Sequence, residues 1–218
     1  MKNKVVIVVG GSKGIGKGVV DNFNSLGAIV HSLSRNNCDI TNSDQIDSYF
    51  DKLDKVDILI NNAAINYCKP IEDISLNEWN SVIDTNLTSF FYIIKTCLPL
   101  MKEGSKIVNV SSIAGRNKSL VSGVHYTSSK AGLIGLTRQL AQELGPKGIN
   151  INCVCPSQTL TPMLESSMTK FEIHKLSKNI PLRRIAHIHE VVKPILFLCS
   201  DDASYIHGAC LDINGGQL

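Results

Sequence analysis

The chain has 218 residues, of which 43% are hydrophobic and 19% charged, and its formal net charge is +3 at pH 7. This composition excludes a disordered chain and fits one globular domain, residues 1–218, that buries an ordinary core. Basic and acidic residues are mixed along the chain, so we expect no nucleic-acid partner. No apolar stretch approaches the ~20 residues of a membrane span, and the first is too short for a signal peptide, so we predict a cytoplasmic protein without membrane contact.

Apolar runs and amphipathic stripes alternate along the chain, which predicts an α/β fold: a single-domain, Rossmann-like, doubly wound parallel sheet with helices on both faces. The expected strands are Val5–Val9, Ile29–Leu33, Val56–Asn61, Lys106–Val110, Ile149–Cys155 and Ala209–Ile213. The expected helices run from Ile15 to Leu26, over Ser43–Leu53, Leu76–Met101 and Tyr126–Leu144, and within Pro162–Ser200.

A further strand, third in chain order, is expected only if Cys38–Ile40 forms it. Arg35–Asn37 alone separate this segment from the strand before it, whereas a parallel crossover needs about a dozen residues. We therefore expect about seven strands, the third of them a stub.

Seven cysteines are scattered without CxxC spacing. Cys153 and Cys155 would share one face of a strand, which raises metal ligation as an alternative, but no Cys or His pair elsewhere completes a tetrahedral set. We interpret the cysteines as small core residues and predict neither a disulfide nor a metal site. His187 and His189 are interpreted as a polar approach to a helix.

A glycine-rich turn, Gly10–Gly16, lies between the first strand and the first helix. Gly10 can adopt the turn, while Gly14 and Gly16 let the backbone approach a pyrophosphate at the helix N-terminus, where free N–H groups favour negative charge. The context predicts a dinucleotide site to which Ser12, Lys13 and Ile15 also belong. A tight turn without a ligand is the alternative.

The second strand should end beside the adenosine ribose, where Asp or Glu would bind the 2′-hydroxyl of NAD. Ser34 and Arg35 stand there instead. A guanidinium pairs with a 2′-phosphate, and Lys13 supplies a second charge, so the predicted cofactor is NADP(H). A solvated arginine in a loop is the alternative.

Tyr126 and Lys130 are four residues apart on an amphipathic helix and therefore share a face. A lysine cation and a positively charged nicotinamide ring would lower the phenol pKa and favour the phenolate. Tyr126 would then protonate a carbonyl oxygen while hydride reaches the carbon, and the reverse steps would oxidise an alcohol. A tyrosine at the core boundary beside a surface lysine is the alternative.

The chain resembles the classical short-chain dehydrogenase/reductase family over nearly its whole length. The glycine turn is similar to TGxxxGxG, Asn61–Ala64 to NNAG, Tyr126–Lys130 to YxxxK and Pro156–Met163 to PGxxxTxM, and the region from Pro181 resembles 3-oxoacyl-(acyl-carrier-protein) reductases. The chain departs from these motifs at Val9, Ala64 and Ser157, and none of the three differences removes a reacting group.

The resemblance implies a catalytic tetrad in an enzyme that interconverts a carbonyl and a secondary alcohol with NADP(H). Its members would be Asn86, Ser112, Tyr126 and Lys130, with Ser112 preferred to Ser111 as the serine that orients the substrate and Asn86 holding a water that links Lys130 to solvent. Further cofactor contacts would be Asp39, Ile40, Asn62, Ala63, Thr159 and Thr161.

A non-catalytic, NADP-binding regulatory protein on the same fold is the alternative function, and the complete tetrad favours the enzyme. The implied partners are a small-molecule carbonyl or alcohol substrate and further copies of the chain, in a homotetramer or homodimer.

Overall fold

Six parallel strands form one sheet in the computed structural model, which describes residues 1–217 apart from the side chain of Ser167. Their order in the sheet is β2-β1-β3-β4-β5-β6. The strands are β1 (Val5–Val9), β2 (Ile29–Leu33), β3 (Ile58–Asn61), β4 (Lys106–Val110), β5 (Asn150–Pro156) and β6 (Cys210–Ile213). Because the chain leaves β1 to one side and returns to its other side at β3, a crevice is expected beyond the carboxyl ends of these two strands.

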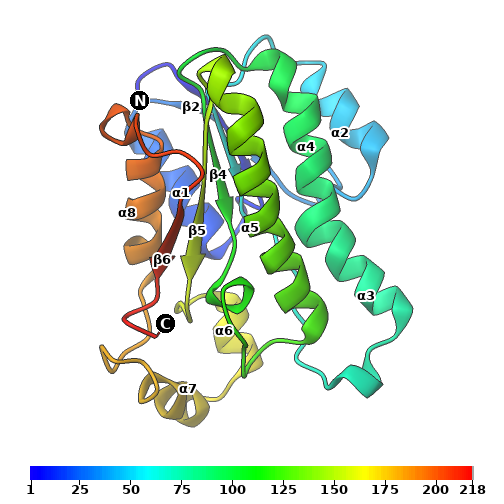
Figure 1. Cartoon of the computed structure of the whole chain (residues 1–218), viewed down its shortest axis with the longest axis vertical. Helices are drawn as coiled ribbons and strands as arrows, with labels where there is room; N and C mark the ends of the chain where they lie inside the picture. Colours follow the sequence, from blue (N-terminus) through cyan, green and yellow to red (C-terminus); the bar gives the residue numbers. More distant parts are fainter. Residues whose placement is uncertain (218) are drawn as a thin grey trace.

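Helices cover both faces of the sheet (Figure 1). One face carries α1 (Gly14–Ser25) and α8 (Ile188–Leu198), and the other carries α2 (Ser43–Phe50), α4 (Ser89–Cys97) and α5 (Val124–Leu144). Two short helices, α6 (Pro162–Ser167) and α7 (Lys170–Ser177), lie beyond the carboxyl ends of the strands, at the lower end of Figure 1. The fold class predicted from the sequence is confirmed.

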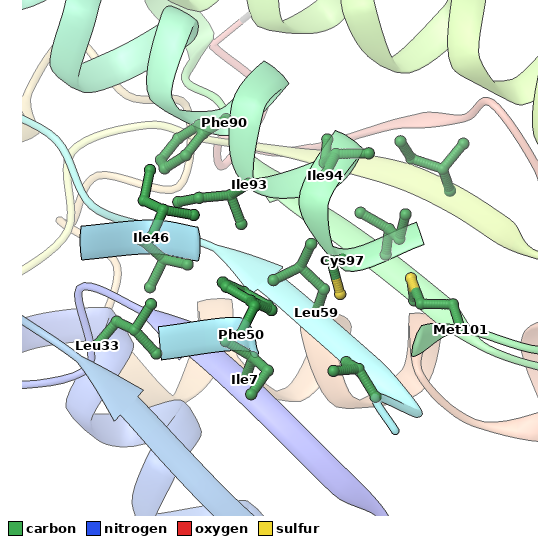
Figure 2. Close-up of a cluster of buried hydrophobic side chains, with 14 of the residues drawn as sticks. Ile7, Leu33, Ile46, Phe50, Leu59, Phe90, Ile93, Ile94, Cys97 and Met101 are labelled. Atoms are coloured by element: carbon green, nitrogen blue, oxygen red, sulfur yellow. The ribbon is translucent and has the colours of Figure 1, made fainter. Parts of the chain in front are cut away.

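The burial of β1 explains its uninterrupted apolar sequence. Ile7 and Val9 face the helix layer of α2 and α4, while Val6 and Val8 face α1 and α8. Figure 2 shows the first of these cores, in which side chains of α2 and α4 pack against side chains of the first three strands and against Met101. The labelled residues are Ile7, Leu33, Ile46, Phe50, Leu59, Phe90, Ile93, Ile94, Cys97 and Met101. A strand buried on both faces needs apolar residues at every position.

The segment Cys38–Ile40 forms no strand, so the expected seventh strand is absent from the described residues. The backbone N–H groups of Asn37 and Cys38 both donate to the carbonyl oxygen of Ser34, at 3.0 and 2.9 Å, and close a tight turn. This turn leads directly into α2, and Cys38 and Ile40 pack against the core instead of extending the sheet. The connection is too short for a crossover, and β2 remains at the edge.

The helix expected over Leu76–Met101 is interrupted. It consists of α3 (Leu76–Ile83), a π-helical turn at Asp84–Thr88, α4, and a 3-10 turn at Leu98–Leu100. The helical region expected after Pro162 divides into α6, α7 and α8. No helix in residues 1–217 has both the length and the apolar character to cross a membrane.

Candidate active site

The glycine turn is held between the carboxyl ends of three strands. Gly10 has a φ of +79°, and a Cβ there would lie 2.7 Å from the Cα of Ala63, so only glycine fits. Its N–H donates to the carbonyl oxygen of Leu33 at 2.8 Å, and its carbonyl oxygen accepts from Asn62 Nδ2 at 2.9 Å. The structure therefore brings Asn62 and Ala63 against the turn.

Helix α1 starts at this turn with its N-terminus toward the same crevice. A Cβ on Gly16 would lie 2.1 Å from the carbonyl oxygen of Gly10, so the helix can begin this close to the turn only with glycine. Lys13 is the N-cap residue and has no side-chain oxygen to accept from the first-turn N–H groups, which remain available to an anion. Ser12 and Lys13 are exposed beside them, whereas Ile15 packs into the core under α8.

The segment after β2 contains the residues predicted to bind the adenosine end of a cofactor. Asn37 orders it: its side chain accepts from the N–H of Ser34 and donates to the carbonyl oxygen of Ser32, each at 2.8 Å. Arg35 is exposed at the tip of this turn. Asp39 Oδ1 accepts from the N–H and the hydroxyl of Thr41, which lowers the pKa of the carboxyl group, so this oxygen is already engaged within its own turn.

Tyr126 and Lys130 share one face of α5, as their spacing predicts. Lys130 is 1% exposed; its Nζ lies 5.6 Å from the centroid of the Tyr126 ring and donates to the carbonyl oxygen of Val110 at 2.8 Å. Burial lowers the pKa of Lys130 to about 8. Burial also raises the pKa of Tyr126, and the hydrogen bond with Ser112 opposes this rise only in part. The predicted lowering of the phenol pKa requires a bound nicotinamide ring as well as Lys130, so it stays a prediction; in the protein by itself desolvation outweighs the effect of Ser112.

The two candidate serines at the end of β4 have different partners. The hydroxyl of Ser112 accepts from the N–H of Ala114 at 3.1 Å, and it is close enough to the Tyr126 side chain to lower the pKa of the phenol. Ser111 is buried, and its hydroxyl donates to the carbonyl oxygen of Lys130 at 2.8 Å. Ser112 thus lies beside the phenol, whereas Ser111 joins the strand to α5.

Asn86 lies in the π-helical turn and is fully buried. Its side chain accepts from the N–H of Ile65 and donates to the carbonyl oxygen of the same residue, both at 2.9 Å. It also donates to the hydroxyl of Ser129 at 3.2 Å, and that hydroxyl donates to the carbonyl oxygen of Tyr126 at 2.7 Å. Asn86 therefore reaches α5 through Ser129, a positioning residue that the sequence motifs did not single out.

The segment after β5 closes the site from the other side. Thr159 is 6% exposed, its hydroxyl donates to the carbonyl oxygen of Ser157 at 3.2 Å, and its backbone forms a bridge with Ala186. Thr161 caps α6, and its Cγ2 lies 3.6 Å from the position of a Cβ on Gly14. The fold thus brings the PGxxxTxM-like segment against the glycine turn, although 147 positions separate Gly14 from Thr161 in the sequence numbering.

Three buried polar atoms near these segments lack a hydrogen-bond partner among the described residues: Asn66 Oδ1, His125 Nε2 and Gln158 Oε1. His125 immediately precedes Tyr126, and Gln158 follows Ser157 in the closing segment. Unpartnered polar atoms are costly in a protein interior, which makes these side chains candidates for contact with a bound molecule. The sequence motifs gave no signal for them.

The chemical capacity of the site follows from these contacts. A phenol with a raised pKa remains protonated near neutral pH and can donate a proton, and a hydroxyl beside it can bind the same oxygen atom. The turn and the start of α1 offer backbone N–H groups to a phosphate-bearing ligand. The residues present therefore fit a dinucleotide, with a proton donor at one end of its site.

Comparison with known proteins agrees with this arrangement. A family model described as enoyl-(acyl carrier protein) reductase matches residues 31–217. The 3-oxoacyl-(acyl-carrier-protein) reductase FabG of Buchnera aphidicola subsp. Baizongia pistaciae is 34% identical, covering 98% of this chain and 97% of the relative. That of Aquifex aeolicus is 33% identical, covering 100% and 98%.

Among solved structures, ligand-free aldohexose dehydrogenase from Thermoplasma acidophilum superposes with a TM-score of 0.92 at 32% identity, covering 99% of this chain and 94% of that one. A short-chain dehydrogenase/reductase from Brucella melitensis gives 0.92 at 28% identity, covering 100% and 98%. The sequence motifs, the sheet and these relatives agree, and the chain belongs to the short-chain dehydrogenase/reductase family of oxidoreductases.

Proposed function

We propose that the protein is an NADP(H)-dependent oxidoreductase that interconverts a carbonyl and a secondary alcohol, with Tyr126 as the general acid and base. The observation that carries this proposal is that Lys130 Nζ, fixed by its hydrogen bond to Val110, lies over the Tyr126 ring, with Ser112 close enough to the phenol to affect its pKa. When bound, the nicotinamide cofactor supplies or accepts the hydride. A non-catalytic NADP-binding protein would have no need of this arrangement of side chains.

The roles of the side chains follow from their contacts. Ser112 donates to the substrate oxygen and fixes it beside the Tyr126 hydroxyl, which gives its proton to that oxygen in reduction and takes it back in oxidation. Lys130 holds a positive charge beside the phenol, which stabilises the phenolate left after donation. Asn86 and Ser129 hold the first turns of α5 against the loop at Ile65, which keeps the phenol in position.

The cofactor assignment rests on charge at the adenosine end. Arg35 and Lys13 are exposed basic residues, one after β2 and one at the start of α1, and β2 ends without a carboxylate next to Arg35. A 2′-phosphate would receive charge-assisted hydrogen bonds there. Thr159 and Thr161, across the turn from Gly14, would bind the nicotinamide end.

The test is turnover of a carbonyl and alcohol panel, beginning with reduction of 3-oxoacyl thioesters by NADPH and oxidation of aldohexoses by NADP⁺, because relatives are named as the corresponding reductase and dehydrogenase. Tyr126→Phe should lower turnover by about 10²–10⁴-fold or more, since it removes the proton donor and keeps the ring. NADPH binding, measured by fluorescence titration, should be nearly unchanged. A parent protein that binds NADPH and turns over no member of the panel would favour the regulatory alternative, and near-parental rates in the Phe variant would remove Tyr126 from its role.

We also propose that the chain forms a homodimer or homotetramer. Apolar side chains of the α3, α4 and α5 layer are exposed, including Phe91 at 51% and Leu76 at 73%, and a second copy would cover them. Sedimentation equilibrium should give a multiple of 23.8 kDa. A sedimenting mass equal to one chain would contradict this proposal.

A further inference from the structure

Three cysteines from two adjacent strands lie together on one face of the sheet. Cys153 and Cys155 lie on β5, Cys210 lies on β6, and all three pack with Ile134 of α5. The Sγ atoms of Cys153 and Cys155 are 4.0 Å apart, and Cys210 packs against this cluster as the register partner of Cys153. No group of three or more His, Cys, Asp or Glu side chains in residues 1–217 is arranged to hold a metal ion, so the chemistry to consider is that of the thiols themselves.

The strand register decides which pair of thiols can bond. Cys153 and Cys210 are register partners on adjacent parallel strands, which lie ~4.7–4.9 Å apart and thus within the Cα separation of ~4.4–6.8 Å found in disulfides. Cys153 and Cys155 are two residues apart on one strand, about 6.6 Å, at the upper end of that range. The diagonal from Cys155 to Cys210 is about 8 Å, beyond it.

The three thiols also differ in access and in charge. Cys153 and Cys155 are fully buried, whereas Cys210 is partly exposed on the edge strand. Hydrogen bonds from the other two thiols lower the pKa of Cys210, and the charges of Arg138 and Arg116 act in the same direction. The same thiol contacts and burial raise the pKa of Cys153. Cys210 is therefore the more accessible thiol and the more easily ionised one, and the buried Cys153 lies beside it on the next strand.

We propose that Cys210 and Cys153 form a modification site for hydroperoxides, in which Cys210 is oxidised first and Cys153 then closes an intramolecular disulfide. The Cys210 thiolate attacks one oxygen of the peroxide, the O–O bond breaks, and the leaving hydroxide takes up a proton to form water, which leaves a sulfenic acid. Cys153 loses its proton and attacks the Cys210 sulfur, the S–O bond breaks, and the second hydroxide leaves as water with that proton. The two thiols lose two electrons, and the peroxide gains them.

This inference is independent of the proposed function, because its test needs no turnover. The reduced full-length protein is treated with hydrogen peroxide, the remaining thiols are alkylated, and tryptic peptides are analysed by mass spectrometry. Cys153 and Cys155 lie in the same tryptic peptide, and Cys199 lies in the same peptide as Cys210. The linked cysteines are therefore identified in a Cys155→Ala, Cys199→Ala double variant as well as in the parent. The expected product is one linked peptide pair that is two hydrogens lighter than its parts and separates on treatment with dithiothreitol.

Two variants separate the steps. In Cys210→Ser the linked pair should be lost, while Cys68→Ser, which removes an exposed loop thiol, should leave it unchanged. In Cys153→Ala the first step should remain, so dimedone should trap the sulfenic acid at Cys210. A link from Cys155 to Cys210, a link between two molecules through Cys210, or an unmodified Cys210 after peroxide treatment would each overturn the proposal.

Discussion

Lys130 Nζ lies 5.6 Å from the centroid of the Tyr126 ring. Its hydrogen bond to the carbonyl oxygen of Val110 fixes the amine at the end of β4, so the sheet sets the distance between the two side chains. Burial of this ammonium group lowers its pKa to about 8, from 10.5 in the exposed group. The site therefore contains a charge that the folded protein holds at a cost in stability.

This cost gives a prediction for Lys130→Met. The lowered pKa means that keeping Lys130 charged in the folded protein costs about 3 kcal/mol at pH 7, and Met avoids this cost. Met also loses the hydrogen bond to Val110, which offsets about 1 kcal/mol of the gain. The variant should therefore gain about 2 kcal/mol in the free energy of unfolding at pH 7, measured by denaturant titration.

The difference in stability between the parent protein and the Lys130→Met variant should depend on pH. Between about pH 8 and 10.5 the unfolded chain binds a proton at Lys130 that the folded chain does not, so the parent gains stability as pH rises through this window. The advantage of the Met variant should therefore shrink from pH 7 to pH 10. A constant difference between the parent and the variant would contradict the lowered pKa of Lys130.

The neighbouring serines should differ in their effect on catalysis. Ser112→Ala removes the hydroxyl beside Tyr126 and should lower carbonyl reduction by about tenfold or more. It also removes the acceptor of the Ala114 N–H, which should cost about 1 kcal/mol in the free energy of unfolding. Ser111→Ala removes the hydroxyl that donates to the carbonyl oxygen of Lys130 and should cost about 1 kcal/mol in the free energy of unfolding. Turnover and the free energy of unfolding are measured for both variants. A larger loss of turnover in Ser111→Ala than in Ser112→Ala would assign the orienting role to Ser111.

Arg35 should determine the choice between the two dinucleotides. A charge-assisted hydrogen bond contributes about 1.5–3 kcal/mol, so the parent should bind NADPH more tightly than NADH by roughly 10–100-fold. Ser34→Asp with Arg35→Ala should reverse the order, because a carboxylate repels a 2′-phosphate and accepts from a 2′-hydroxyl. Lys147→Ala, at the far end of α5, should leave both affinities unchanged. Equal affinities in the parent would show that Arg35 stays in solvent.

Two helix glycines provide a matched test of the turn. In Gly16→Ala the new Cβ would lie 2.1 Å from the carbonyl oxygen of Gly10 and 2.5 Å from Asn62 Nδ2, so the turn must open and cofactor affinity should fall. In Gly135→Ala, within α5, the Cβ meets no atom within 4 Å. This variant should keep its cofactor affinity, because no atom of the same chain stands in the way of the new Cβ. Equal affinities in both variants would contradict the role of Gly16.

The sequence by itself determined the parallel sheet and most of the candidate site. Short β-branched runs that glycines end, such as Val5–Val9, favour a strand buried on both faces. The spacing of Tyr126 and Lys130 places them on one helix face, and the position of the glycines between a strand and a helix specifies the turn. These features depend on neighbours within a few residues, so the local pattern contains them.

Only the tertiary structure decided the features that depend on distant segments. Cys38 and Ile40 pack against the core that α2 and α4 form on the sheet instead of extending the sheet. Ser111 and Ser112 are adjacent and chemically identical, and their different partners on α5 distinguish them. The phenol pKa rises because packing removes water from Tyr126, and Cys210 meets Cys153 because β6 returns beside β5. Contacts of this kind follow from how the layers pack, which no local pattern of residues encodes.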